Sequence, residues 1–92
     1  MKVRIRFFSE LGEVIGRDIM ADTNEGSVLS ELITKVSRKN PEGYDAIFDK
    51  NGNIREFVVL ARNGRQLDMR EAGNTIVEEG DDITIFPPIS GG

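Results

Sequence analysis

The stretch Ser27 to Lys39, SVLSELITKVSRK, predicts the one convincing helix in this chain of 92 residues. Its apolar residues recur at positions i, i+1, i+4, i+5 and i+8 and so form one stripe at helical spacing: Val28, Leu29, Leu32, Ile33 and Val36. Basic residues gather toward its C-terminal end, where the helix dipole favours cations, and Asn40-Pro41 ends it. The stripe could bind a partner, but we expect it to cover a sheet, because the chain has no other large element for that role.

Two short strands precede this helix. Lys2 to Phe7 alternate polar and apolar residues, which predicts a half-buried strand with one apolar face: Val3, Ile5 and Phe7. Arg17 to Ala21 predicts a second strand, paired with the first as a hairpin. Between the two strands we expect a brief helical turn, with Ser9 as its N-cap and Gly16 as its stop.

Three more strands are predicted after the helix. Tyr44, Ile47 and Phe48 indicate one further helical turn packed on the core. Phe57 to Ala61 predicts the third strand, and Asn63-Gly64 is a strong hairpin signal that leads into a short return strand, Gln66-Leu67. A polar loop then runs to the last strand, Asp82 to Phe86.

The resulting order, β-β-α-β-β-β, predicts an α+β fold in which a mixed sheet of four to five strands packs on one main helix. This order is typical of the β-grasp, or ubiquitin-like, fold. In that fold the first and last strands lie side by side and parallel in the centre of the sheet. We therefore expect one β-grasp domain over residues 1–86, followed by an extended, flexible C-terminal tail over residues 87–92.

The composition excludes several function classes. The chain contains no cysteine and no histidine, which removes thiolate chemistry, the commonest metal ligand and the commonest general base. The net charge of −4 argues against binding to nucleic acid or to anionic membranes and favours a partner with a basic face. We expect a cytoplasmic protein, monomeric when free, with no bound cofactor, no metal and no catalytic residue of its own.

An acidic cluster precedes the last strand: Glu78, Glu79, Asp81 and Asp82. Paired carboxylates can perform acid–base chemistry, but neighbouring residues of a strand point to opposite faces, and no nucleophile accompanies them. A solvated charged loop is the favoured interpretation, and a docking surface for a basic partner is the alternative.

The last six residues, Pro87 to Gly92, favour delivery of a carboxylate into a partner. Pro87 and Pro88 end strand pairing and hold the chain extended, and Ile89 and Ser90 continue toward Gly91-Gly92. At roughly 3.1 Å per residue such a tail can reach about 19 Å beyond the domain. The two glycines lack Cβ atoms and can enter a narrow cleft, and the terminal carboxylate is ionised at neutral pH.

An apolar docking face is predicted at the root of this tail. If the buried faces of the strands follow the alternation above, Phe8 and Phe86 point outward from parallel neighbouring strands and lie near each other. Phe57, Val59 and Ala61 point outward from an adjacent strand. Isolated exposed apolar residues are ordinary, but several together more often mark a docking patch.

Three features of the chain stand together: Phe7-Phe8, Gly80-Asp81, and above all the terminal motif Phe86-Pro87-Pro88-Ile89-Ser90-Gly91-Gly92. Through these features the whole chain resembles the MoaD/ThiS family of sulfur carriers. The stretches 48–54 and 58–64 resemble the longer MoaD-like branch, to which small archaeal modifier proteins belong. One departure is that Ser27-x-x-Ser30 stands where many relatives have Thr-x-x-Glu, which weakens a helix capping box.

The resemblance implies an activity at Gly92. An E1-like activating enzyme would use ATP to adenylate the Gly92 carboxylate, and Gly91 would give access to its active site. A sulfur donor would convert the acyl-adenylate to a thiocarboxylate for the large subunit of molybdopterin synthase, or a target-protein lysine would attack it and form an isopeptide bond. Two alternatives remain open: a dedicated small subunit of molybdopterin synthase without protein conjugation, and an interaction module with an idle Gly-Gly end.

Overall fold

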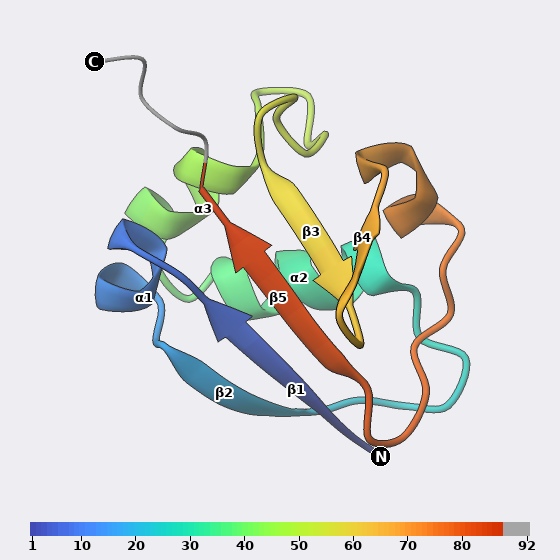
Figure 1. Cartoon of the computed structure of the whole chain (residues 1–92). Helices are drawn as coiled ribbons and strands as arrows, with labels where there is room; N and C mark the ends of the chain where they lie inside the picture. Colours follow the sequence, from blue (N-terminus) through green and yellow to red (C-terminus); the bar gives the residue numbers. More distant parts are fainter. Residues whose placement is uncertain (88–92) are drawn as a thin grey trace.

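A computed structural model of the chain describes residues 1–87, which form one mixed sheet with helices packed on one of its faces (Figure 1). The sheet contains β1 (Lys2–Phe7), β2 (Asp18–Asp22), β3 (Val59–Arg62), β4 (Arg65–Leu67) and β5 (Asp82–Phe86). The helical elements are α1 (Glu10–Val14), α2 (Leu29–Ser37), α3 (Pro41–Ile47) and the 3-10 helix η1 (Met69–Gly73).

The strand order is β2-β1-β5-β3-β4. β1 and β5 are parallel neighbours, whereas the pairs β1–β2, β5–β3 and β3–β4 are antiparallel. This arrangement confirms the predicted ubiquitin-like β-grasp fold of the α+β class, including the parallel pairing of the first and last strands.

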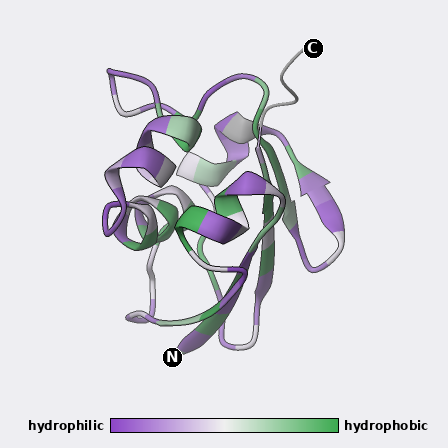
Figure 2. Ribbon diagram, turned by 90° about the vertical axis from the view of Figure 1, so that its left-hand side faces the viewer, coloured by the Kyte–Doolittle hydropathy of each residue, from purple (hydrophilic) through white to green (hydrophobic). Residues whose placement is uncertain are grey.

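The core lies between the sheet and α2, as the apolar stripe of that helix predicts. Leu29, Leu32, Ile33 and Val36 are buried, and they face the inward side chains of β1 and β5. Figure 2 shows the sheet edge-on, with hydrophobic residues concentrated between it and the helices. Within residues 1–87, none of the helices is long and apolar enough to span a bilayer.

The helix starts differ from the sequence prediction. α2 begins at Leu29, and the Ser27 hydroxyl donates to the Asn24 carbonyl 2.6 Å away instead of capping the helix. Ser9 precedes α1 but forms no side-chain cap, because its backbone takes the unusual conformation φ 53°, ψ −136°. The turn is closed instead by the Gly12 amide, which donates to the Ser9 carbonyl at 3.0 Å.

Several strand and helix boundaries also differ from the sequence prediction. β2 runs from Asp18 to Asp22, one residue later than predicted. β3 begins at Val59, because the amide of Val58 donates to the carbonyl of Arg55 and closes a turn that contains Phe57. The predicted further turn is the seven-residue helix α3, for which the Asn40 side chain accepts from the amide of Gly43 and Pro41 is the first residue.

The Asn63-Gly64 hairpin is confirmed, because Arg62 and Arg65 are paired and both turn residues have positive φ, 52° and 84°. The loop after β4 contains η1, which the sequence analysis missed. A capping box between Asp68 and Glu71 stabilises its start.

Candidate functional site

The rings of Phe8 and Phe86 are stacked on the outer face of the sheet. Phe7 is paired with Ile85 across β1 and β5, and the amide of Phe8 donates to the carbonyl of Ile85 at 3.0 Å, so Phe8 lies beside Phe86. The ring centroids are 4.7 Å apart with an interplanar angle of 21°. Both side chains remain partly exposed, at 38% and 39%. The predicted proximity of the two rings on an exposed face is confirmed.

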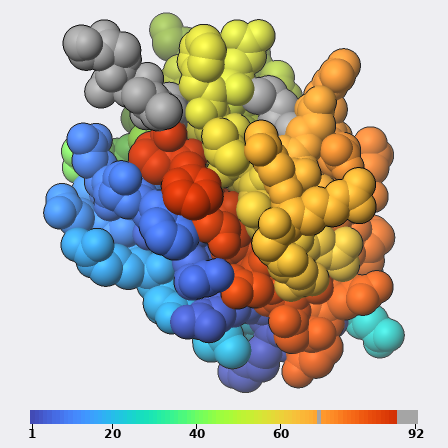
Figure 3. Space-filling view, viewed as in Figure 1, coloured from blue at the N-terminus to red at the C-terminus, as the bar shows by residue number. Residues whose placement is uncertain are grey.

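β3 extends this apolar surface on the other side of β5. Val59 is paired with Phe86 and Ala61 with Thr84, and both β3 residues are half-buried. Val58 and Leu60 are buried in the core, as the predicted alternation requires. Phe8, Phe86, Val59 and Ala61 together form what we call the aromatic patch. In Figure 3, β5 reaches the surface between β1 and β3 on this face.

Phe57 lies apart from these strand residues. It belongs to the turn before β3 and is 72% exposed, so the prediction that it is an outward-facing strand residue is wrong. The aromatic pairs in the described part of the chain join Phe8 to Phe86 and Tyr44 to Phe48, and neither includes Phe57. Its position just before β3 still places it at the same end of the sheet as Phe86.

Paired charges lie beside the aromatic patch on the outer face. Arg6 donates two hydrogen bonds to Asp82, at 2.9 Å and 3.1 Å, and Arg4 pairs in the same way with Asp18. The hydrogen bond from Arg4 lowers the pKa of Asp18. Because these arginines already have carboxylate partners, the aromatic patch borders a largely neutralised surface, which suits a partner that makes apolar contacts.

Asp81 is buried, which corrects the interpretation of the acidic cluster as wholly solvated. Its Oδ2 accepts from Arg62 Nε at 3.0 Å and from the amide of Glu78 at 2.8 Å, and its Oδ1 accepts from Asn63 Nδ2 at 3.0 Å. Burial acts to raise the pKa of Asp81, but these hydrogen bonds outweigh burial and lower its pKa overall. The network ties the β3–β4 turn to the start of β5.

This network was missed because its members are far apart in the sequence. Asn63-Gly64 indicates a hairpin and Gly80-Asp81 indicates the approach to a strand, but neither motif shows that the two meet. The one available signal is chemical: an ionised carboxylate such as that of Asp81 has two oxygens that can accept several hydrogen bonds.

Within residues 1–87, no group of three or more Asp or Glu side chains is arranged so that it could hold a metal ion. Pro87 follows β5 directly. The remaining tail residues of the prediction lie outside the described residues: Pro88, Ile89, Ser90, Gly91 and Gly92.

Comparisons with known proteins agree with the fold. Small archaeal modifier protein 3 of Haloferax volcanii is 27% identical over 97 aligned residues, which cover 100% of both chains. The crystal structure of SAMP1 from Haloferax volcanii has the same fold, with a TM-score of 0.84 and 24% identity over 100% of both chains. Subunits 1 and 2 of the molybdopterin-converting factor from Helicobacter pylori 26695 form a solved complex, in which the matching chain gives a TM-score of 0.58 and 23% identity over 100% of both chains. The model of the ThiS family matches residues 5–92, and the chain therefore belongs to this family of ubiquitin-like small modifier and sulfur-carrier proteins.

Proposed function

We propose that this protein is a small modifier and sulfur carrier activated at the carboxylate of Gly92. An E1-like enzyme binds the domain and adenylates that carboxylate with ATP, and the activated tail is then conjugated to target lysines, converted to a thiocarboxylate for molybdopterin synthesis, or used for both. We place this activity in the cytoplasm, with the free chain as a monomer and ATP bound by the enzyme.

The chemistry requires activation because a carboxylate is a poor acylating agent. Attack of the Gly92 carboxylate on the α-phosphorus of ATP forms an acyl-adenylate and releases pyrophosphate. Sulfur at the oxidation level of hydrosulfide then attacks the acyl carbon: the C–S bond forms, the C–O bond to AMP breaks, and loss of the S–H proton leaves a thiocarboxylate. A lysine amine attacking the same carbon forms an amide, releases AMP and loses one proton.

The position of the aromatic patch at the end of β5 is the observation that supports this proposal. Phe86 is the last residue of the strand, and Pro87 follows at once. An enzyme that binds Phe8 and Phe86 therefore contacts the domain where residues 87–92 begin. An extended segment of six residues spans about 19 Å, enough to bring Gly91-Gly92 into a neighbouring active site.

A second candidate is a dedicated small subunit of molybdopterin synthase that is never conjugated to proteins. The matching Helicobacter pylori chain is one half of a complex of two molybdopterin-converting factor subunits, which favours this alternative. In that case the aromatic patch would contact the large subunit, and the tail would enter the active site of that subunit.

The decisive test is activation in a purified system. The full chain is incubated with the E1-like enzyme of its own organism, ATP and radiolabelled pyrophosphate, and exchange of label into ATP is measured. A variant lacking Gly91 and Gly92 is expected to give no exchange while its circular dichroism spectrum is unchanged. Exchange by the shortened variant, or none by the full chain, would contradict the proposal, and the latter result would favour an interaction module with an idle tail.

Mass spectrometry of the tagged protein recovered from cells separates the two end uses. Replacement of one Gly92 oxygen by sulfur, without adducts and with stable co-purification of a large subunit, would identify the dedicated synthase subunit. Target peptides carrying Gly91-Gly92 on a lysine side chain would establish protein modification, and both products together would show one tail serving two pathways.

A further inference from the structure

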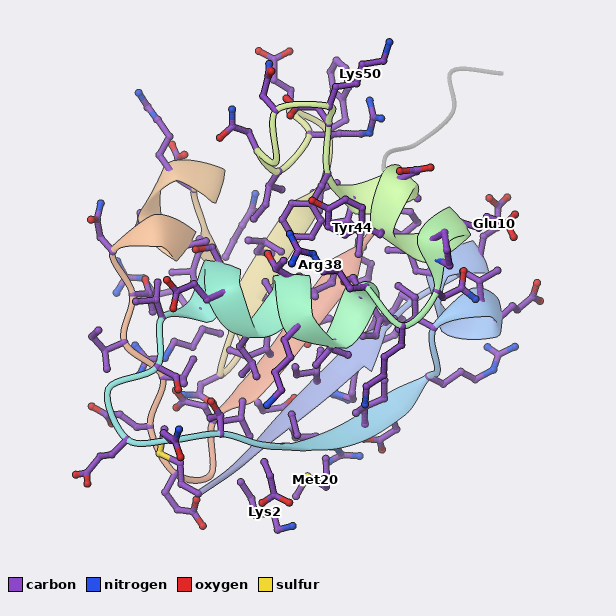
Figure 4. The ribbon with its side chains drawn as sticks, turned by 180° about the vertical axis from the view of Figure 1, so that it is seen from behind. Lys2, Glu10, Met20, Arg38, Tyr44 and Lys50 are labelled. Atoms are coloured by element: carbon purple, nitrogen blue, oxygen red, sulfur yellow. The ribbon has the colours of Figure 1, made fainter. Side chains whose placement is uncertain are left out.

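A groove lies at the end of the molecule where β5 begins, at the opposite end of that strand from the aromatic patch. It has a volume of about 580 Å³ and is lined by the loop before α2, the loop before β5 and the first residue of the chain: Met1, Glu25, Gly26, Ile76, Val77, Glu78 and Glu79. Figure 4, which views the molecule from behind, shows the two loops running side by side at this end.

The walls of the groove are held together by backbone pairing. Val28 and Ile76 form an antiparallel bridge, and on either side of it the amide of Leu29 donates to Thr75 at 2.8 Å and the amide of Val77 donates to Ser27 at 2.9 Å. A surface fixed by hydrogen bonds on both walls is largely preformed, so a partner does not have to order it on binding.

The third wall is fixed in the same way. The Met1 amine donates to the carbonyl of Thr23 at 2.9 Å, and the amide of Thr23 donates back to Met1 at 3.0 Å. The amide of Gly80 donates to the carbonyl of Lys2 at 2.9 Å and fastens the loop before β5 to the start of β1.

The groove combines an apolar contact with a negative rim. Ile76 is 49% exposed although it lies beside the fully packed Val77. Glu25, Glu78 and Glu79 are exposed, and none of the ion pairs found in residues 1–87 involves them.

Two cations from strands next to the groove are already paired with carboxylates. The Lys2 ammonium pairs with Asp22 at 2.9 Å, and the Arg62 guanidinium pairs with Asp81 at 2.9 Å. The Met1 amine is the remaining positive group on the groove, and it donates to a carbonyl. The groove carries three carboxylates and one amine, so its rim has a net negative charge, in keeping with the net charge of −4 for the chain.

We propose that this acidic-rimmed groove is a docking site for a basic segment of a partner protein. An aliphatic side chain of the segment packs on Ile76, while flanking lysine or arginine side chains meet Glu25 and Glu78. The groove and the aromatic patch are separated by the length of β5, about 13 Å at roughly 3.3 Å per residue. A short segment bound in the groove therefore does not contact the aromatic patch, and its binding is independent of any chemistry at Gly92.

The test is an NMR titration of the ¹⁵N-labelled full chain with the peptide acetyl-Gly-Lys-Ile-Lys-Ile-Arg-Gly-amide. We expect saturable shifts confined to the amides of residues 25–28 and 76–79, and binding that weakens as salt is added. The same peptide with glutamate in place of every basic residue is expected not to bind. Absence of saturable binding by the basic peptide, or shifts spread over the outer face of the sheet, would overturn the proposal.

Matched variants separate the groove from the general negative charge of the chain. The double variant Glu25→Gln/Glu78→Gln is expected to bind the peptide at least tenfold more weakly. Glu31→Gln/Glu42→Gln, which removes the same charge from the exposed first turns of α2 and α3, is expected to bind as the unmodified protein does. Equal losses in both double variants would mean that net charge alone attracts the peptide, and the docking site would be rejected.

A third variant tests the apolar contact. Ile76→Ser is expected to weaken binding severalfold while the salt dependence stays the same, because it removes an aliphatic contact and no charge. An unchanged affinity of this variant would show that the peptide does not enter the groove.

Discussion

Asp81 and Arg62 form the least exposed ion pair among the residues that the structure describes, with side chains 6% and 27% exposed and with Oδ2 2.9 Å from Nη2. The amide of Arg4 also donates to the carbonyl of Asp81, at 2.9 Å. This residue therefore connects β1, the β3–β4 turn and the start of β5. Its place at the junction of the three central strands makes it a determinant of how β5 is held in the sheet.

Replacement of Asp81 by asparagine is expected to lower the free energy of unfolding by about 2–3 kcal/mol, because it removes the buried carboxylate charge that pairs with Arg62. Urea denaturation monitored by circular dichroism measures the change. Asp22→Asn is the matched control, since Asp22 forms an exposed pair with Lys2, and it is expected to cost less than about 1 kcal/mol. Equal losses in the two variants would contradict the assigned role of Asp81.

The pH dependence of stability follows from the lowered pKa of Asp81. The folded state holds this pKa below its ordinary value of 3.8, so the stabilisation is fully present above that value and is lost as the pH falls through the folded-state pKa. We expect the difference in unfolding free energy between the unmodified protein and Asp81→Asn to be constant between pH 7 and about pH 5 and to shrink below about pH 4. A difference that stays constant down to pH 2 would show that the charge of Asp81 is not responsible.

Phe86→Asp is expected to weaken binding to the activating enzyme by at least tenfold, since it places a charge in the centre of the aromatic patch. Calorimetric titration with the enzyme measures the affinity. Met20→Asp is the control, because Met20 is 61% exposed and lies on β2, opposite Arg4 and away from the patch. An affinity unchanged by Phe86→Asp, in a protein that melts cooperatively, would remove the aromatic patch from the docking surface.

Phe57→Ser tests whether Phe57 contributes to binding of the activating enzyme without contributing to the stability of the domain. Phe57 is 72% exposed in a turn, so its replacement is expected to change the unfolding free energy by less than about 0.5 kcal/mol. If the predicted docking face includes this residue, the affinity for the activating enzyme falls at least threefold in the same calorimetric assay. Full affinity in this variant would restrict the docking face to the strand residues.

Gly43→Ala is expected to destabilise the domain by about 1–3 kcal/mol through overpacking between α1 and α3. A Cβ at Gly43 would collide with Ile15 Cγ1 and would lie 2.6 Å from Ile15 Cδ1. Gly73→Ala is the control, since a Cβ there meets no atom within 4 Å, and it is expected to be neutral or slightly stabilising. Thermal unfolding of the two variants measures the difference, and equal melting temperatures would contradict a costly collision with Ile15.

Local patterns predicted the elements of this fold well and their boundaries less well. The alternation of Lys2 to Phe7 and the stripe in α2 report side-chain direction, which depends on residues a few positions apart. Boundaries depend on competing hydrogen bonds. Ser27 could have capped α2, but its hydroxyl donates to the carbonyl of Asn24 instead. Phe57 belongs to a stretch with a strand-like pattern, but the turn at Arg55–Val58 ends before β3 begins and places Phe57 outside the strand.

The sequence by itself determined the buried and exposed faces of the strands, the apolar side of α2 and the Asn63-Gly64 turn. It also predicted that Phe8 lies beside Phe86, because the fold that it indicates pairs the first and last strands. Only the tertiary structure decided that Asp81 is buried against Arg62 and that Gly26 and Ile76 share one groove. The physical reason is that side-chain direction repeats over a few residues. Contacts between distant loops depend instead on how the whole sheet and its helices pack.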